Sequence, residues 1–399
     1  MSAESPPLRI VIIGAVAAGT SAAAKARRND ETAEIVLYDR DRHISYSGCG
    51  LPYYIGGQVQ DFGSLVPRDA GFFRKKYNVE VRVRHEVLSV DAGRKRLRVR
   101  NLEDGSEFED RYDILVLATG AASVVPPIPG ADRPHVFALR NPSDALAIRK
   151  YMDDRHPASA VVVGSGFIGM EMTESFVRAG LSVTVVEKLP RVCPFLDPDM
   201  SPYLADHLEK QGVALRTGRI ATEILDSAVR LDDGSEVPGE LVLLAVGIRP
   251  ETSLARAMGI EMGTTGAIRV DERMRTSLPD VFACGDCAES VSIVDGRPVY
   301  RPLGSTANKM GRIAGDAMTG GSLAHRGIAG TGIFQVLDMA VAAAGLSEKE
   351  ARDSGYDVVV SHNIKPDKPE YFGGREMVIK TLADRRTGRL LGVQIVGYE

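Results

Sequence analysis

The sequence predicts an α/β protein with two Rossmann-like, three-layer (ββα) dinucleotide-binding domains and a smaller C-terminal α+β domain. The order of strand, glycine turn, helix and strand occurs twice, at residues 9–39 and 160–187. From about Gly327 the pattern changes to long alternating strands, including 332–342 and 376–382, around a short helix at 347–354. A chain of 399 residues is too long for one hydrophobic core, so several domains are expected.

Composition excludes several classes of partner. Apolar residues make up 44% and charged residues 26% of the chain, and the net charge is −4, which gives no electrostatic reason to expect nucleic acid or an acidic membrane. The longest charge-free stretch, 114–131, contains prolines and cannot form an unbroken spanning helix. The N-terminus has no apolar signal core, and four scattered cysteines are too few for a disulfide framework. We expect a reducing cytoplasmic location and no metal site.

The first dinucleotide unit begins with the apolar strand 9–13 and passes through a glycine turn into an alanine-rich helix from about Gly19 to Arg28. The turn reads Gly14-Ala15-Val16-Ala17-Ala18-Gly19, with valine at the middle glycine position of the fingerprint. Asp39 follows 20 residues beyond Gly19, where a carboxylate binds ribose hydroxyls. A Rossmann-like unit without a nucleotide is the alternative.

The second unit carries the full fingerprint Gly164-Ser165-Gly166-Phe167-Ile168-Gly169, with a strand before it and a helix expected at 170–179. The first glycine makes the tight turn, the second lets a pyrophosphate approach the helix, and the third lets helix and strand close. Glu187 at the ribose position favours NADH slightly, whereas Lys188 could accommodate the 2′-phosphate of NADPH. A purely structural glycine turn is the alternative.

A cysteine follows the second strand of the first unit, in the run Ser45-Tyr46-Ser47-Gly48-Cys49-Gly50-Leu51-Pro52. Ligands of this fold bind at the carboxyl edge of the sheet, so we expect the Cys49 thiol near the cofactor. A cysteine thiolate can attack a disulfide and form a mixed disulfide. A buried cysteine without chemistry is, on position alone, an equally weighted alternative.

These motifs, with Ala118-Thr119-Gly120, Gly285-Asp286 and Ser45-Tyr46-x-x-Cys49-x-Leu51-Pro52-Tyr53-Tyr54, resemble the single-cysteine branch of the FAD-dependent pyridine nucleotide-disulfide oxidoreductases. Within that glutathione-reductase-like family, the chain looks most like the coenzyme A-disulfide reductases and NADH-dependent polysulfide or persulfide reductases. The resemblance runs from about Leu8 to the C-terminus. It implies that electrons pass from NAD(P)H through FAD to Cys49, which reduces a low-molecular-weight disulfide, persulfide or polysulfide. Coenzyme A is expected as substrate or as a Cys49 adduct.

The resemblance also implies the cofactor sites. For FAD it implies Gly14, Ala17, Ala18, Gly19, Asp39, Arg40, Ala118, Thr119, Gly120, Gly285, Asp286, Pro302 and Ala307. For NAD(P)H it implies Gly164, Gly166, Ile168, Gly169, Glu187, Lys188 and Gly247. In a homodimer, Tyr371 of the partner subunit would be the general acid, although a turn tyrosine without a catalytic part is an equal alternative, and Phe372 stands where the family has a second tyrosine.

A coenzyme A substrate would need cations for its ADP phosphates. The candidate substrate residues are Ser45, Arg27, Lys75 and Asn308. The two basic clusters that contain Arg27 and Lys75 also contain Lys25, Arg28, Arg68, Arg74 and Lys76. An ordinary solvated surface is the more common fate of such side chains.

Two absences favour a sulfur substrate. A dithiol relay is excluded because Tyr54 stands where glutathione-reductase-type enzymes have their second cysteine, and Ala17 stands where the peroxidases have a histidine. Cys284 and Cys287 are interpreted as small wall residues. An oxygen-reducing NADH oxidase and an electron-transfer reductase for a redox protein are the alternative functions.

The expected domains are an FAD-binding domain at 1–122 and 249–325, an NAD(P)H-binding domain at 123–248, and a dimerisation domain at 326–399. The last is expected to be incomplete, because the family continues beyond Gly397 with further elements of the interface.

Overall fold

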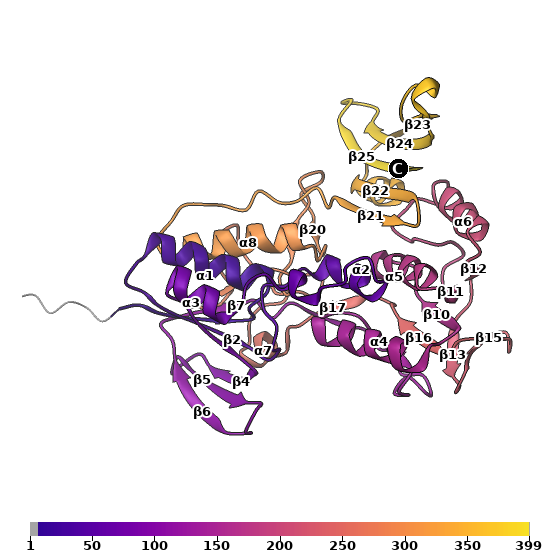
Figure 1. Cartoon of the computed structure of the whole chain (residues 1–399). Helices are drawn as coiled ribbons and strands as arrows, with labels where there is room; N and C mark the ends of the chain where they lie inside the picture. The colour runs from indigo at the N-terminus through magenta and orange to yellow at the C-terminus, as the bar shows by residue number, and fades with distance from the viewer. Residues whose placement is uncertain (1–6, 399) are drawn as a thin grey trace, which may run out of the picture. The chain divides into compact units, whose positions relative to one another are not determined.

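The structure is a computed structural model that describes residues 7–398 and divides into two compact units (Figure 1). The first unit comprises the described residues up to Gly48, together with Phe62–Ala122 and Arg249–Ile328. The second comprises Cys49–Asp61, Ser123–Ile248 and the described residues from Ala329 onward. The short strands β8 (Ala121–Ser123) and β17 (Ile248–Pro250) lie where the chain passes from one unit to the other.

A five-stranded parallel sheet forms the centre of the first unit. In spatial order its strands are β18 (Val281–Ala283), β7 (Ile114–Leu117), β1 (Arg9–Ile13), β2 (Glu34–Asp39) and β3 (Glu80–Val83). All residues of β1 are buried, as expected for a parallel strand covered on both faces. The unit also contains an antiparallel meander and several helices: β4 (His85–Asp91), β5 (Arg96–Asn101), β6 (Glu107–Arg111), α1 (Ala17–Asn29), α3 (Ala70–Tyr77), α7 (Ser253–Ala257), α8 (Gly304–Ala317), β19 (Ser290–Val291) and β20 (Pro298–Val299).

Helices α1 and α8 lie side by side because small residues line their contact (Figure 1). A Cβ atom at Gly311 would overlap the carbonyl oxygen of Ala18, and one at Gly315 would overlap that of Ala22. The alanine-rich sequence of α1 therefore serves close helix packing. This packing fixes the helix that follows the first glycine turn.

The second unit contains a second parallel sheet. Its strands, in spatial order, are β12 (Ala214–Thr217), β11 (Ser182–Glu187), β10 (Ser159–Val163), β16 (Leu241–Leu244) and β9 (Val136–Phe137). The associated elements are α2 (Leu51–Ile55), α4 (Pro142–Arg155), α5 (Phe167–Arg178), α6 (Ser201–Lys210), β13 (Ala221–Ile224), β14 (Ala228–Leu231) and β15 (Glu236–Pro238). The continuous buried run Ala160–Val163 reflects cover on both faces of this sheet.

The C-terminal part of the second unit is an antiparallel sheet with one helix. The strands, in spatial order, are β21 (Gly332–Val336), β22 (Met339–Gly345), β25 (Leu390–Tyr398), β24 (Glu376–Asp384) and β23 (Val358–Pro366), and the helix is α9 (Glu348–Asp353). Two Rossmann-like sheets and a C-terminal α+β domain confirm the predicted fold class. Within residues 7–398, none of the helices combines the length and apolar character needed to cross a membrane.

The expectation of one strand over 332–342 is wrong, because the chain turns back between β21 and β22. Val336 pairs with Met339, and Leu337 between them has the left-handed φ of +58°. The turn consists of Leu337, which is buried, and Asp338, which is half-buried, and it lacks the glycine or asparagine that marks exposed hairpins. A tertiary hydrogen bond holds it instead: the Leu337 N–H donates to Glu174 Oε2 at 2.9 Å.

Both helices after the glycine turns begin earlier than expected. Helix α1 begins at Ala17 rather than Gly19, and α5 begins at Phe167 rather than Met170. The last glycine of each turn, Gly19 or Gly169, therefore lies inside a helix. Its role is packing of the helix against the preceding strand.

Candidate functional site

The first glycine turn is shaped by the chain's own packing. Gly14 has φ +105°, and a Cβ there would overlap the carbonyl oxygen of Ala118. A Cβ at Gly19 would in turn overlap the carbonyl oxygen of Gly14. Val16 is the N-cap residue of α1 and makes no capping side-chain hydrogen bond. The start of α1 thus has the character of an anion-binding helix N-terminus.

Asp39 ends β2 with its carboxylate turned to the glycine turn. Its Oδ2 accepts a hydrogen bond from the Ala15 N–H at 2.7 Å, and Oδ1 accepts one from the Asp41 N–H at 2.8 Å. Burial raises the pKa of this carboxyl group. Arg40 beside it is exposed. A carboxylate in this place fits the predicted role of binding a ribose.

Other residues predicted to bind FAD lie at the carboxyl ends of neighbouring strands of the same sheet. Ala118, Thr119 and Gly120 follow β7, and Gly285 and Asp286 follow β18. A Cβ at Gly285, which has φ +80°, would lie 2.7 Å from the Ala18 Cβ and 3.5 Å from the Ala307 Cβ. Pro302 precedes α8 and is half-buried. The first unit thus brings together α1, α8 and the strand ends, and this arrangement fits a dinucleotide such as FAD.

The second glycine turn repeats the outer two contacts and differs at its middle. Gly164 has φ +101°, and a Cβ there would overlap the Ala245 carbonyl oxygen, while one at Gly169 would overlap the Gly164 carbonyl oxygen. A Cβ at Gly166 would meet no described atom within 4 Å. The protein's own packing does not require glycine at 166. The space fits a pyrophosphate approaching the N-terminus of α5.

Glu187 is the buried carboxylate of this turn. Its Oε2 accepts hydrogen bonds from the Ser165 N–H at 2.9 Å and the Ser165 Oγ at 2.6 Å, and its Oε1 accepts one from the Leu189 N–H at 2.9 Å. Lys188 and Gly247 are exposed, and Ile168 is half-buried. These residues fit a nicotinamide dinucleotide.

Cys49 lies in a 3₁₀ turn, Gly48–Gly50, directly before α2. It is exposed, and α2 is held to α5 by a 2.8 Å hydrogen bond from Ser175 Oγ to the Pro52 carbonyl. Partial burial of the thiol, and then the negative charge of Glu171, raise its pKa. The bare side chain therefore resists ionisation.

Sequence reasoning gave Glu171 no role, although this residue lies two positions after the second fingerprint. Burial, and then the charge of Glu174, raise its pKa to about 7. It belongs to the same unit as Cys49 and acts electrostatically on that thiol. The signal in the sequence that could have identified it is an acidic residue in the first turns of the helix that follows the second glycine turn.

The other cysteines differ from Cys49. Cys193, Cys284 and Cys287 are fully buried, and burial raises the pKa of each. The Cys287 thiol donates to the carbonyls of Leu117 at 3.3 Å and Cys284 at 3.4 Å. Cys284 and Cys287 thus pack in the core of the first unit beside β7.

A cavity of about 300 Å³ opens in the first unit beside α1. It brings together two predicted substrate residues, Ser45 and Asn308, and the lining also includes Tyr46 and Phe72. Its cationic lining residues are Arg28, Arg68 and Arg312. Ser45 has φ +49° and donates its N–H to the Ala15 carbonyl at 2.9 Å, so the cavity wall is linked to the first glycine turn.

The other two predicted substrate residues, Arg27 and Lys75, do not line this cavity. Arg27 Nε and both Nη atoms donate to the backbone carbonyls of Asp30, Glu31, Ala33, Tyr77 and Asn78. Its guanidinium is therefore used for structure. Lys75 is exposed and does not line the cavity. Arg28, the neighbour of Arg27, lines the cavity instead.

Tyr371 lies in a 3₁₀ turn, Glu370–Phe372, between β23 and β24. It is 82% exposed, and its ring centroid lies 4.8 Å from that of Phe372. Two large exposed aromatic rings in one turn suit a surface that another chain covers.

Residues 8–311 match the family described as pyridine nucleotide-disulphide oxidoreductase, and residues 333–399 match the dimerisation domain of the same family. The chain belongs to this family. Its members are FAD-dependent NAD(P)H oxidoreductases, which confirms the predicted enzyme class and cofactors.

Individual family members are similar over nearly the whole chain. The chain is 37% identical over 402 residues to the NAD(P)H coenzyme A polysulfide/persulfide reductase of Pyrococcus horikoshii, covering 99% of this chain and 89% of that protein. It is 33% identical over 398 residues to an NADH oxidase of Methanocaldococcus jannaschii, covering 98% and 88%. The crystal structure of reduced CoADR-RHD from Bacillus anthracis superimposes with a TM-score of 0.96 at 33% identity, covering 100% and 72%. The predicted resemblance to the sulfur-reducing branch is confirmed.

Proposed function

We propose that the protein uses NAD(P)H and FAD to reduce a low-molecular-weight disulfide, persulfide or polysulfide at Cys49, with a coenzyme A derivative as the favoured substrate. The observation that carries the proposal is the contrast between Cys49, which is exposed, and Cys193, Cys284 and Cys287, which are buried. Tyr54 stands where a resolving cysteine would be. An accessible thiol without a neighbouring thiol forms its mixed disulfide with an external sulfur compound.

The chemistry assigned to Cys49 has two steps. Its thiolate attacks one sulfur of R–S–S–R, the Cys49–S–S–R bond forms, and R–S⁻ leaves and takes up a proton. Two electrons from NAD(P)H then break that mixed disulfide, releasing the second R–S⁻ and restoring the Cys49 thiolate. When bound, FAD supplies the carrier between the two-electron donor and the thiol. Residues of the two glycine turns, with Asp39 and Glu187, would hold the two dinucleotides.

The cavity beside α1 supports a coenzyme A derivative. Three arginines line it, no lining residue among those described is acidic, and guanidinium groups bind phosphates through paired hydrogen bonds. Phe72 adds an aromatic face for a base. Tyr46 lines the cavity three residues before Cys49, so their Cα atoms lie within roughly 11 Å by chain length alone. The pantetheine arm of coenzyme A is longer than this span.

We further propose that the chain forms a homodimer through the domain at 326–399. The match to a dimerisation domain supports this, as do its exposed apolar residues Ile333, Ile364, Tyr371, Phe372 and Leu390. In such a dimer, Tyr371 of the partner subunit would donate the proton to the leaving thiolate. From the two glycine turns, we also propose that residues 1–122 and 249–325 bind FAD and that residues 123–248 bind NAD(P)H.

The central test compares wild type with Cys49→Ser under anaerobic conditions. We expect coenzyme A disulfide to add one coenzyme A to Cys49 by mass, and NADH to release it. Cys49→Ser should lose disulfide turnover while NADH still bleaches the flavin. Full turnover by Cys49→Ser would refute the assignment, and rapid oxygen consumption by a wild type inert to sulfur compounds would favour the oxidase.

The cavity is tested with Arg28→Ala against Arg94→Ala, an exposed arginine in the β4–β5 turn as matched control. Loss of one phosphate ligand should raise the KM for coenzyme A disulfide about tenfold, the loss expected for one charge-assisted contact. The KM for cystine, which has no phosphate, should stay unchanged. Equal KM values in the two variants would remove Arg28 from the substrate site.

A further inference from the structure

Three polar side chains form a row across the C-terminal sheet. His362 on β23 pairs directly with Lys380 on β24, and Lys380 pairs directly with Gln394 on β25. Directly paired residues of neighbouring strands point to the same face of a sheet. Lys380 is 1% exposed and Gln394 is 2% exposed. A lysine and a glutamine are therefore buried side by side where apolar residues would be expected.

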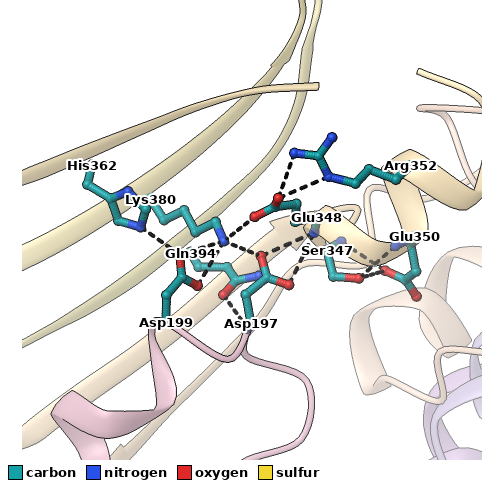
Figure 2. A network of polar contacts seen from close by, with 9 residues as sticks. All are labelled: Asp197, Asp199, Ser347, Glu348, Glu350, Arg352, His362, Lys380 and Gln394. Carbon is teal, nitrogen blue, oxygen red and sulfur yellow. Dashed lines mark hydrogen bonds and ion pairs between the residues drawn. The ribbon is translucent and has the colours of Figure 1, made fainter. Parts of the chain in front are cut away.

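The row contacts the segment that joins β11 to α6 (Figure 2). Gln394 Oε1 accepts the Asp197 N–H at 2.8 Å. Lys380 Nζ lies 2.8 Å from Asp199 Oδ1 and 3.1 Å from Asp197 Oδ2. His362 Nε2 lies 2.9 Å from Asp199 Oδ2. Each residue of the row thus contacts Asp197 or Asp199 of this segment.

Helix α9 completes the cluster from another side (Figure 2). Glu348 Oε2 lies 2.8 Å from Lys380 Nζ, and the Glu348 N–H donates to both carboxylate oxygens of Asp197 at 3.1 Å. Burying one ammonium among three carboxylates incurs a large desolvation cost. Well-packed apolar residues in place of such a cluster often give the same stability or more. Unlike apolar packing, such a cluster holds its carboxylates in one defined position.

The other end of the same segment reaches the second glycine turn. The Cys193 N–H donates to Ser165 Oγ at 3.0 Å, and Ser165 Oγ donates to Glu187 Oε2 at 2.6 Å. Ser201 Oγ donates to the Val192 carbonyl at 2.7 Å, so the segment is closed on itself at the start of α6. Three residues separate Cys193 from Asp197. Polar contacts at its two ends, joined by the backbone between Cys193 and Asp197, therefore connect Lys380 to the glycine turn.

We propose that the row His362–Lys380–Gln394 is a positioning device of the C-terminal sheet that holds the NAD(P)H-binding glycine turn through residues 192–200. The inference rests on the proposed function, in which Gly164–Gly169 and Glu187 bind NAD(P)H. The orientations of Ser165 and Glu187 depend on where Cys193 is held, and Cys193 is held by the segment fixed to the row. Lys380 acts only through these intermediates and is a positioning residue.

The experiment uses the holoenzyme with Lys380→Met and Gln394→Leu, and with Lys349→Met as matched control. Lys349 lies on α9, is 83% exposed and pairs with Asp353, so its loss removes the same charge without touching the segment. Affinity for NADH, and for NAD⁺ as a non-reducing probe, is measured by calorimetry beside Tm and flavin content. Both row variants should weaken binding roughly three- to thirtyfold, as for residues coupled through intermediates, and Lys349→Met should leave it unchanged.

A merely structural role would lower Tm and leave both affinities at the wild-type value, and that result would overturn the inference. If Lys380→Met does not fold, Gln394→Leu decides the question, because it removes only the acceptor of the Asp197 N–H. Gly166→Val separates the two proposals. Wild-type NADH affinity in Gly166→Val would refute the nucleotide assignment itself. Lost affinity in Gly166→Val with unchanged affinity in both row variants would refute the row alone.

Discussion

The two glycine turns of the molecule share their outer positions and differ at the middle one. Gly14 and Gly164 both have φ near +100° and both would clash with the carbonyl of a neighbouring strand end if they carried a side chain. At the middle position the first turn has Val16 and the second has Gly166, beside which there is open space. The outer glycines are therefore required by the fold, whereas Gly166 is free of any such requirement and marks room for a ligand.

The turns also differ in their hydrogen-bond partners. In each, the residue after the first glycine donates its N–H to the carboxylate of the second strand, from Ala15 to Asp39 at 2.7 Å and from Ser165 to Glu187 at 2.9 Å. The Ala15 carbonyl accepts the Ser45 N–H, in the segment that leads to Cys49. The Ser165 hydroxyl instead accepts from the Cys193 N–H. One turn is linked to the reactive segment and the other to the C-terminal sheet.

The largest expected effect is on stability when an outer glycine is replaced. Gly14→Ala and Gly164→Ala should each lower the free energy of unfolding by about 3 kcal/mol or more, because a Cβ overlaps a backbone carbonyl at a left-handed φ. Denaturant unfolding measures this. Gly105→Ala is the control, since Gly105 has φ +75° and nothing within 4 Å, and should lose only about 1 kcal/mol. Equal losses at all three positions would contradict the steric explanation.

The next largest effect concerns the middle positions of the two glycine turns. Gly166→Val should weaken NADH binding about a hundredfold, close to 2.7 kcal/mol, with little change in Tm, because the new side chain fills the open space before α5. Val16→Gly in the first turn should leave FAD content unchanged. Calorimetry for NADH and the flavin absorbance per chain measure the two outcomes. If Gly166→Val lowers Tm as strongly as Gly164→Ala, the middle glycine serves the fold after all.

The smallest expected effect concerns Glu171. While ionised, this carboxylate disfavours the Cys49 thiolate, so Glu171→Gln should speed alkylation of Cys49 roughly three- to tenfold at pH 8. The pKa of Glu171 is about 7, so the carboxyl is neutral at lower pH and the two proteins should then react alike. Iodoacetamide rates between pH 5.5 and 8.5 provide the measurement. If the ratio of the Glu171→Gln rate to the wild-type rate stays constant across this pH range, the electrostatic cause is excluded.

Much of the fold followed from local pattern. Apolar strands followed by a glycine turn and an acidic residue about 20 positions later predicted both dinucleotide units, because this spacing is imposed by short-range backbone geometry. The hairpin at Leu337 was missed, since its Leu337-Asp338 turn has no glycine or asparagine to mark it and depends on the distant Glu174.

The candidate substrate residues were harder to predict from the sequence, because neighbouring positions on one helix point in different directions. Arg27 and Arg28 are equivalent in sequence, yet Arg27 donates to the carbonyls of Tyr77 and Asn78, some 50 residues away, while Arg28 lines the cavity. The effect of Glu171 on Cys49 likewise depends on burial and on Glu174, which only the folded chain brings to bear. Sequence pattern predicted the candidate site, and tertiary contacts decide which of its candidate residues line the cavity.

The burial of Cys193, Cys284 and Cys287 has a practical consequence for oxidative damage. Since over-oxidation of a cysteine needs an accessible thiolate, peroxide should over-oxidise only one cysteine of the folded protein, Cys49. In the native state, one equivalent of a thiol reagent per chain would then count the competent molecules in a preparation. Any second equivalent would report molecules that have begun to unfold.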